Sequence, residues 1–309
     1  MPTGGSTDLV GWIASHRQRL DELAYSVGAV LLRGFDVAGP AVFGAVMNAL
    51  SAEVLAYGER SSPRSQVAEG VYTSTDHPAD LPIALHNEQS YTLDWPLRIV
   101  FFCEIEPTDC GRTPLADSRR VLAALRPETV ASFERLGVRY VRNYLPGLGL
   151  SWQEAFQAQD RVDAERYCHA AGIACEWIGD DQLRTSQVRP AVRAHPATGE
   201  RTWFNHALFF HITSMPAGAD LLAAVGEENL PFQTYYGDGR PIEDEVLSEL
   251  RAAYAACTTS FPWRRGDVLV VENMITAHAR EPFSGPRRIL TAMADPVSSA
   301  LATAGKEVS

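Results

Sequence analysis

Residues 263–290 read WRRGDVLVVENMITAHAREPFSGPRRIL, and this stretch decides the fold class. The polar turn RRGD leads into an apolar run, which predicts a buried strand over residues 267–271. A second apolar strand is predicted over residues 287–293, and no helical pattern separates the two. Short apolar strands in close succession are typical of an antiparallel β structure.

The rest of the chain predicts more short strands, with helices at the flanks. Helices are predicted over residues 7–26, 41–55, 151–171 and 242–257, strands over 28–35, 97–105 and 138–144, and a hairpin over 187–205 that turns at 196–200. Strands and helices do not alternate as they do in βαβ units. We therefore predict a mainly antiparallel sandwich or barrel decorated by helices.

The composition is that of an ordinary globular protein. Hydrophobic residues make up 46% and charged residues 21% of the 309 residues, which excludes a disordered, collagen-like or coiled-coil chain. No apolar run approaches the ~20 residues of a membrane span, and no secretory signal is visible, so the predicted location is the cytosol. The net charge of −11 argues against a nucleic-acid or anionic-membrane surface.

Several common site types lack support. The five cysteines form no C-x-x-C pair, which disfavours a zinc–thiolate site or a disulfide framework. The chain has no G-x-S-x-G elbow, no G-x-G-x-x-G fingerprint and no P-loop. Serine-hydrolase chemistry and dinucleotide or nucleoside triphosphate binding therefore have no basis in the sequence.

His86 and Glu88 are the first pair of residues that could bind a metal. On a strand, residues two apart project from the same face, so an imidazole and a carboxylate at this spacing can share one ion. A chain of this composition contains a histidine two residues before an acidic residue about once by chance. The pair alone therefore carries little weight, and a solvated surface pair is the alternative.

His278 and Arg288 strengthen the metal hypothesis. His278 follows the predicted strand 267–271, and Arg288 stands at the head of the next strand. The histidine can complete a 2-His-1-carboxylate facial triad, which leaves open positions on non-haem Fe(II). The arginine can bind a carboxylate bidentately inside a pocket. Taken singly, a core histidine and a surface arginine are the alternatives.

Six segments together resemble the taurine dioxygenase (TauD/TfdA)-like family of Fe(II)/2-oxoglutarate-dependent oxygenases. They are LLRGF (31–35), LHNEQSY (85–91), GRTPLADSRRVL (111–122), WFNHALFFH (203–211), YYGDGRPI (235–242) and residues 263–290. They occur in the order of the family, and the resemblance covers about residues 28–293. The resemblance implies a single domain over residues 1–309, with ends at 1–7 and 300–309 that fray, and a double-stranded β-helix (jelly roll) core.

The resemblance also implies a set of site residues and a reaction. The Fe(II) ligands carry over as His86, Glu88 and His278, and the contacts of 2-oxoglutarate as Thr113 and Arg288. The implied reaction consumes 2-oxoglutarate and O2, releases succinate and CO2, and oxidises whichever C–H bond the pocket presents. Hydroxylation is the expected outcome, and desaturation and epoxidation are variants of the same chemistry.

Three positions refine this expectation. Glu88 stands where most members of the family have aspartate, and where halogenating relatives have a small residue, so halogenation is not expected. Ala292 stands where taurine dioxygenase has the arginine that binds its sulfonate, so a taurine-like substrate is not expected either. We predict that Arg287 points to the face of its strand opposite Arg288 and is not the cosubstrate clamp.

The lead-in TSTDHPADLPIALHNEQSY (73–91) resembles that of family members in peptide-antibiotic biosynthesis. These oxidise amino acids, sometimes tethered to a carrier protein, so we predict an amino acid or a derivative, free or carrier-bound. The candidate substrate contacts are Arg64, Thr73, Ser74, Ser90, Tyr91 and Asn205, each with turn capping or solvent exposure as the alternative. We interpret His206 and His211 as structural.

Two other classes of protein stay open at this point. A metallohydrolase could use the same His/Glu/His set on Zn(II) with an activated water. Thr113 and Arg288 argue against it, because a hydrolase needs no clamp for a dicarboxylate. A catalytically silent binding protein on the same fold is the other alternative. The sequence leaves the substrate and the oligomeric state open.

Overall fold

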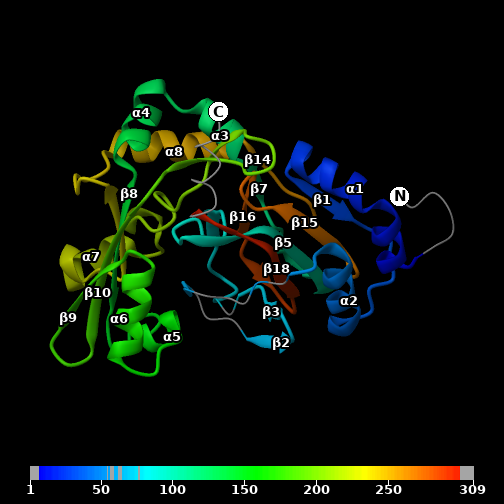
Figure 1. The fold of residues 1–309 in the computed structure, drawn as a ribbon, viewed down its shortest axis with the longest axis horizontal. Helices are drawn as coiled ribbons and strands as arrows, with labels where there is room; N and C mark the ends of the chain where they lie inside the picture. Colours follow the sequence, from blue (N-terminus) through cyan, green and yellow to red (C-terminus); the bar gives the residue numbers. More distant parts are fainter. Residues whose placement is uncertain (1–6, 54, 56–58, 62–64, 76, 300–309) are drawn as a thin grey trace.

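Two antiparallel sheets form the centre of the fold in a computed structural model that describes residues 7–53, 55, 59–61, 65–75 and 77–299 (Figure 1). The larger sheet has the order β1-β15-β5-β18-β3-β2 and the smaller one the order β14-β7-β16-β4. The larger sheet consists of β1 (Ala29–Leu32), β15 (Val268–Glu272), β5 (Asp94–Ile105), β18 (Arg288–Ser298), β3 (Val71–Thr73) and β2 (Gln66–Ala68). The smaller one consists of β14 (Thr258–Thr259), β7 (Leu115–Asp117), β16 (Thr276–Arg280) and β4 (Ile83–His86).

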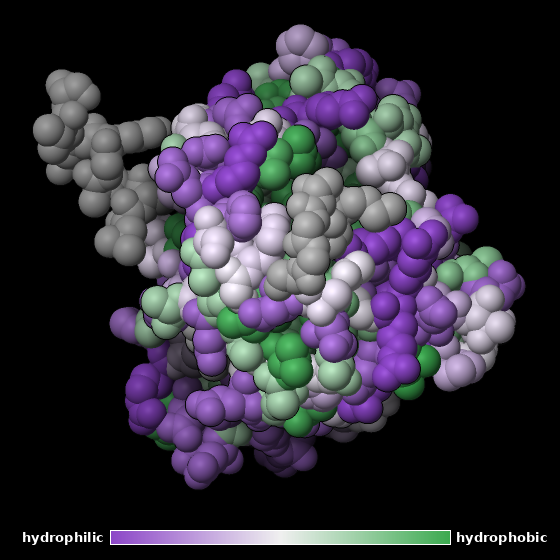
Figure 2. Space-filling model, turned by 90° about the vertical axis from the view of Figure 1, so that its right-hand side faces the viewer, coloured by the Kyte–Doolittle hydropathy of each residue, from purple (hydrophilic) through white to green (hydrophobic). Residues whose placement is uncertain are grey.

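The larger sheet is covered on both faces. Because side chains alternate along a strand, Phe102 and Leu290 contact α1 (Leu9–Val27) and α2 (Pro40–Leu50), whereas Phe101 and Ile289 face the smaller sheet. The two helices lie side by side on the outer face in Figure 1. Figure 2 views the molecule from this side and shows a mosaic of hydrophilic and hydrophobic side chains. The exposed positions of α1 include Gln18, Arg19 and Glu22, whereas those of α2 are Ala41, Ala45 and Asn48.

A third sheet and the remaining helices form the other side of the molecule (Figure 1). This sheet has the order β13-β8-β10-β9, and a hairpin, β11-β12, lies outside it. The strands are β8 (Val138–Tyr144), β9 (Ala174–Ile178), β10 (Gln182–Arg189), β11 (Val192–Ala194), β12 (Arg201–Trp203) and β13 (Phe232–Tyr236), with the short pair β6 (Asp109–Cys110) and β17 (Phe283–Ser284) elsewhere. The helices are α3 (Ser118–Ala124), α4 (Pro127–Leu136), α5 (Trp152–Phe156), α6 (Arg161–Ala170), α7 (Gly218–Val225) and α8 (Asp244–Ala256), with short 3-10 turns η1 (Ile212–Ser214) and η2 (Glu227–Asn229).

The mainly β architecture agrees with the prediction, and β8 has the predicted bounds. The helix predicted over 151–171 is instead two helices, because Gln157 adopts a left-handed conformation (φ 52°) and Asp160 caps a new start. The hairpin is shorter than predicted, since the segment up to Arg189 pairs with β8 and β9. The strand β16, which carries His278, was not predicted.

The structure also bears on two further predictions, the fraying of the chain ends and the absence of a membrane span. Thr7, predicted to fray, accepts a hydrogen bond from the backbone N–H of Asp36. The other residues predicted to fray, 1–6 and 300–309, lie outside the described residues. No helix within the described part of the chain is both long enough and apolar enough to cross a membrane.

Candidate active site

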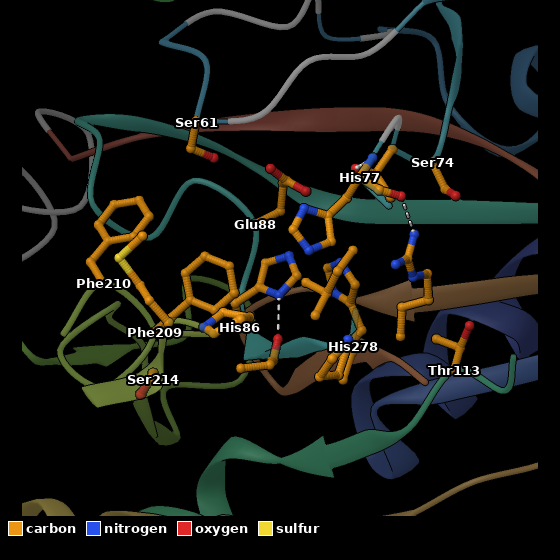
Figure 3. A pocket seen from close by; sticks show the side chains of 18 of the residues that line it. Ser61, Ser74, His77, His86, Glu88, Thr113, Phe209, Phe210, Ser214 and His278 are labelled. Carbon is orange, nitrogen blue, oxygen red and sulfur yellow. Dashed lines mark hydrogen bonds between the residues drawn. The ribbon is translucent and has the colours of Figure 1, made fainter. Parts of the chain in front are cut away.

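Three side chains with metal-binding atoms meet between β4 and β16. His86 is the last residue of β4, Glu88 lies in the turn that follows, and His278 lies directly opposite His86 in the strand register. One nitrogen or carboxylate oxygen from each residue lies within 4.8 Å of the others. All three line a cavity of about 240 Å3 between the sheets (Figure 3). The structure therefore brings the predicted trio together.

The imidazoles are held in orientations that suit a metal. The Nδ1–H of His86 donates to the carbonyl oxygen of Ala84 at 2.9 Å, which leaves Nε2 as the atom that faces the cavity. The ring of His278 packs against Phe101, with 5.1 Å between ring centroids, and lies 4.4 Å from the ring of His86. Two imidazoles and one carboxylate on adjoining backbone segments are the donor set of non-haem Fe(II) sites. The residues present therefore fit the metal.

Asn273 fixes the backbone of Glu88 and was not among the predicted residues. Its side-chain oxygen accepts from the N–H of Glu88 at 2.8 Å, and its side-chain nitrogen donates to the carbonyls of Glu88 and Pro96 at 2.9 and 2.8 Å. Asn87 donates in turn to the carbonyl of Asn273 at 2.6 Å, and both asparagines are fully buried. An asparagine directly after the strand Val268–Glu272 was the signal in the sequence.

We expect Asn273→Ala to lower the free energy of unfolding by about 2–4 kcal/mol, because it removes three hydrogen bonds and leaves buried backbone groups unpaired. Denaturant titration measures this, and Asn48→Ala, at an exposed helical position, is the control. An unfolding free energy equal to that of the control would show that Asn273 does not hold the Glu88 segment.

Thr113 and Arg287 lie at another part of the same cavity. The indole N–H of Trp263 donates to Oγ1 of Thr113 at 3.0 Å, so the hydroxyl proton is left for an acceptor in the cavity. The Nε–H of Arg287 donates to the carbonyl of Gly111 at 3.0 Å. Burial lowers the pKa of Arg287 to about 10, and no ion pair joins it to any described residue. The negative charge of a bound carboxylate would stabilise the protonated guanidinium of Arg287.

Arg288, the predicted clamp, faces the other way. Its side chain is 45% exposed and pairs with Glu104 at 3.0 Å, outside the cavity. The reason is the alternation along β18, where Ile289 faces the cavity and Leu290 packs toward the helices. A bulge between Arg288 and Ile289 also shifts the register against β5. The predicted facing of this strand was wrong by one residue.

Of the predicted substrate contacts, Ser74 lines the cavity. Thr73, Ser90, Tyr91 and Asn205 are not among its lining residues, because their polar groups serve the protein's own structure. The hydroxyl of Tyr91 donates to the carbonyl of Glu59, Ser90 contacts His206, Asn205 donates to the carbonyl of Ala191, and Thr73 accepts from the N–H of Ser65. Arg64 lies outside the described residues.

The sequence analysis missed the most prominent parts of the cavity wall. Phe209 and Phe210 lie on one side of the trio, and His77 points into the cavity from the other side (Figure 3). Burial, with the charge of Arg280 nearby, holds the pKa of His77 below its ordinary value, so the ring is neutral at pH 7. Phe232 and Arg280 also line the cavity. The pair of phenylalanines in WFNHALFFH was the signal in the sequence.

Comparison with known proteins identifies the family. The model of the taurine catabolism dioxygenase TauD, TfdA family matches residues 5–293. The chain belongs to this family. Membership in the TauD, TfdA family confirms the predicted fold and the predicted reaction class, an oxygenase that uses Fe(II), 2-oxoglutarate and O2. It also decides in favour of the oxygenase and against the zinc metallohydrolase.

Individual relatives support the assignment. The chain is 42% identical over 280 residues to the dapdiamide synthesis protein DdaC of Enterobacter agglomerans, covering 90% of this chain and 85% of that protein. PvcB, described as an Fe, alpha-ketoglutarate dependent oxygenase from an isonitrile synthetic pathway, has a similar fold, with a TM-score of 0.52 and 18% identity over 91% of this chain and 82% of PvcB. AAD-2, solved with Mn(II) and N-oxalylglycine, gives a TM-score of 0.55 and 15% identity over 94% and 91% of the two chains.

Proposed function

We propose that this TauD-family oxygenase hydroxylates an unactivated C–H bond of an amino acid or an amino-acid derivative, free or carrier-bound, in natural-product biosynthesis. The observation that carries the proposal is the shared cavity, in which His86, Glu88 and His278 converge and which Thr113 and Arg287 also line. The 42% identity to a dapdiamide synthesis protein supports a biosynthetic role.

In this proposal, each group of residues has a separate task. His86, Glu88 and His278 would hold Fe(II) and leave positions open for 2-oxoglutarate and O2. The metal supplies the oxidation, coupled to conversion of 2-oxoglutarate to succinate and CO2. Arg287 and Thr113 bind the distal carboxylate of 2-oxoglutarate, one with a charge and the other with the hydroxyl proton that the bond from Trp263 leaves available.

The aromatic wall provides the other half of the site. Phe209, Phe210 and Phe232 line the cavity, and Phe210 stacks on Phe232 with 4.7 Å between ring centroids. These side chains keep water away and press the apolar part of a substrate toward the metal-binding trio. His206 supports the wall from behind, since it is buried between Tyr91 and Phe210.

We expect Glu88→Asp to weaken iron binding and to increase the share of 2-oxoglutarate consumed without substrate oxidation. The shorter side chain withdraws its oxygen by about one methylene, ~1.5 Å, whereas a metal–carboxylate contact needs ~2.0–2.2 Å. The measurements are an anaerobic iron titration and the ratio of succinate to oxidised product. Glu104→Asp, a carboxylate outside the cavity, is the control. Wild-type iron affinity and coupling in Glu88→Asp would contradict a ligand role.

The function is tested by incubating the protein with Fe(II), 2-oxoglutarate and O2 and a panel of amino acids and N-acyl amino acids, free and carrier-bound. We expect iron-dependent succinate formation that rises with the right compound, and a product that gains one oxygen atom by mass spectrometry. Loss of two hydrogen atoms would identify the desaturase variant instead. No succinate above the iron-free background with any compound would refute the proposal.

A further inference from the structure

Two arginines of the described chain line the cavity, and 2-oxoglutarate accounts for only one of them. Arg280 is two residues beyond His278 on β16, and both side chains line the cavity, although the pairing with β4 shifts its register between them. Arg280 is only 6% exposed and lines the same cavity as Arg287. Arg280 lies on β16 of the smaller sheet, and Arg287 directly precedes β18 of the larger sheet, so the two cations enter the cavity from different walls.

The guanidinium of Arg280 is held in place by backbone groups. Its Nη1 donates to the carbonyl of His77 at 2.9 Å, and its Nη2 donates to the carbonyls of Pro78 and Leu81. Carbonyl oxygens orient the guanidinium but carry no net charge, and no described carboxylate forms an ion pair with Arg280. The nearby carboxylate of Asp80 tends to raise the pKa of Arg280, but Asp80 is exposed and does not line the cavity. Arginine stays protonated at neutral pH. A desolvated positive charge therefore remains at this wall of the cavity.

Among the described groups that line the cavity, the charges of the occupied site leave this one cation unmatched. Glu88 and the carboxylate of 2-oxoglutarate nearest the metal together balance a divalent ion. Arg287 is balanced by the distal carboxylate of 2-oxoglutarate. Glu88 is the only acidic residue among the described residues that line the cavity. Because a buried cation is costly without a counter-ion, the remaining ligand of the site is expected to bring one.

We propose that Arg280 determines the specificity for the substrate, and that the substrate presents a free carboxylate to Arg280. This inference rests on the proposed function. The carbonyl of His77 accepts from Arg280, and the side chains of Ser74 and His77 line the same cavity and offer further hydrogen-bond donors. The apolar body of the substrate then lies toward Phe209 and Phe210. An amino acid tethered through its α-carboxyl as a thioester lacks that carboxylate, so a tethered substrate needs a second one.

The test is a binding measurement that requires no turnover. The protein is loaded with Mn(II) and N-oxalylglycine and titrated by calorimetry with N-acetyl amino acids of small, branched and aromatic side chain, each paired with its primary amide. In wild-type protein, we expect at least one carboxylate to bind about tenfold more tightly than its amide, as a charged hydrogen bond of ~1.5–3 kcal/mol allows. Arg280→Met should bring each pair to within about twofold, and Arg280→Lys should retain part of the preference.

The controls separate the two proposals. Arg288→Met, outside the cavity, should keep the full preference. Failure of the wild-type protein to bind Mn(II) and N-oxalylglycine would overturn the proposed function itself. If both bind but no carboxylate binds more tightly than its amide, the role of Arg280 is refuted. The role is also refuted if Arg280→Met weakens N-oxalylglycine binding as much as Arg287→Met does, because Arg280 would then bind the cosubstrate. It is refuted as well if Arg280→Lys and Arg280→Met lose the preference for the carboxylate over the amide equally.

Discussion

Arg287→Ala should raise the dissociation constant of 2-oxoglutarate by a factor of about 30 or more. Losing one partner of a desolvated charge pair costs ~2–5 kcal/mol, and each ~1.4 kcal/mol changes the dissociation constant tenfold. The effect is large because Arg287 lines the cavity and has no ion pair with any described residue. Calorimetric titration with 2-oxoglutarate in the presence of Mn(II) measures the constant without turnover.

Arg288→Ala is the matched control, because Arg288 is the next residue in the chain and begins β18. Its guanidinium pairs with Glu104 in a 45% exposed position, and exposed ion pairs contribute ~0–1 kcal/mol, so cosubstrate binding should stay within about twofold of the wild type. A large loss in Arg288→Ala with little change in Arg287→Ala would mean that the facing of β18 is reversed. Arg287→Lys should bind poorly as well, because an ammonium cannot form the bidentate contact.

Alternation of side chains along β18 could not decide between these two arginines. This central strand is covered on both sides, so Ile289 on one face and Leu290 and Ala292 on the other are all apolar. Either assignment of the faces is consistent with such a pattern. The bulge next to Arg288 adds a shift that no sequence pattern shows. Packing of the helices against one face decides the orientation.

The metal-binding trio was predictable, whereas the substrate wall largely was not. Histidine and carboxylate are the residue types that chemistry demands at a metal, and their positions within ordered segments singled out His86, Glu88 and His278. Hydroxyl groups have no such restriction. The hydroxyl of Tyr91 is as well satisfied by the carbonyl of Glu59 in the core as it would be by a ligand. Phe209, on the cavity wall, cannot be told from a core residue by its type.

The second large effect is expected at the metal. Wild-type protein, titrated with Fe(II) under anaerobic conditions, should bind one ion per chain, because the trio offers one ligand atom from each of three residues within 4.8 Å of one another. His278→Ala should bind essentially none at micromolar iron. The remaining pair, His86 and Glu88, lies on one short segment and encloses the ion from one side only, whereas His278 brings the ligand from the facing strand.

His211→Ala is the matched control for a lost imidazole. His211 is also buried, but it does not line the cavity and its Nδ1 accepts from the N–H of Thr213 at the start of a 3-10 turn. This variant should bind one iron, even if it is less stable. Metal binding should also raise the unfolding temperature of wild-type and His211→Ala protein and leave that of His278→Ala unchanged, because a ligand stabilises only the state that binds it. Full iron occupancy in His278→Ala would mean that a different set of residues binds the ion. It would also contradict the assignment of Glu88 as a ligand and of the positions left open on the metal.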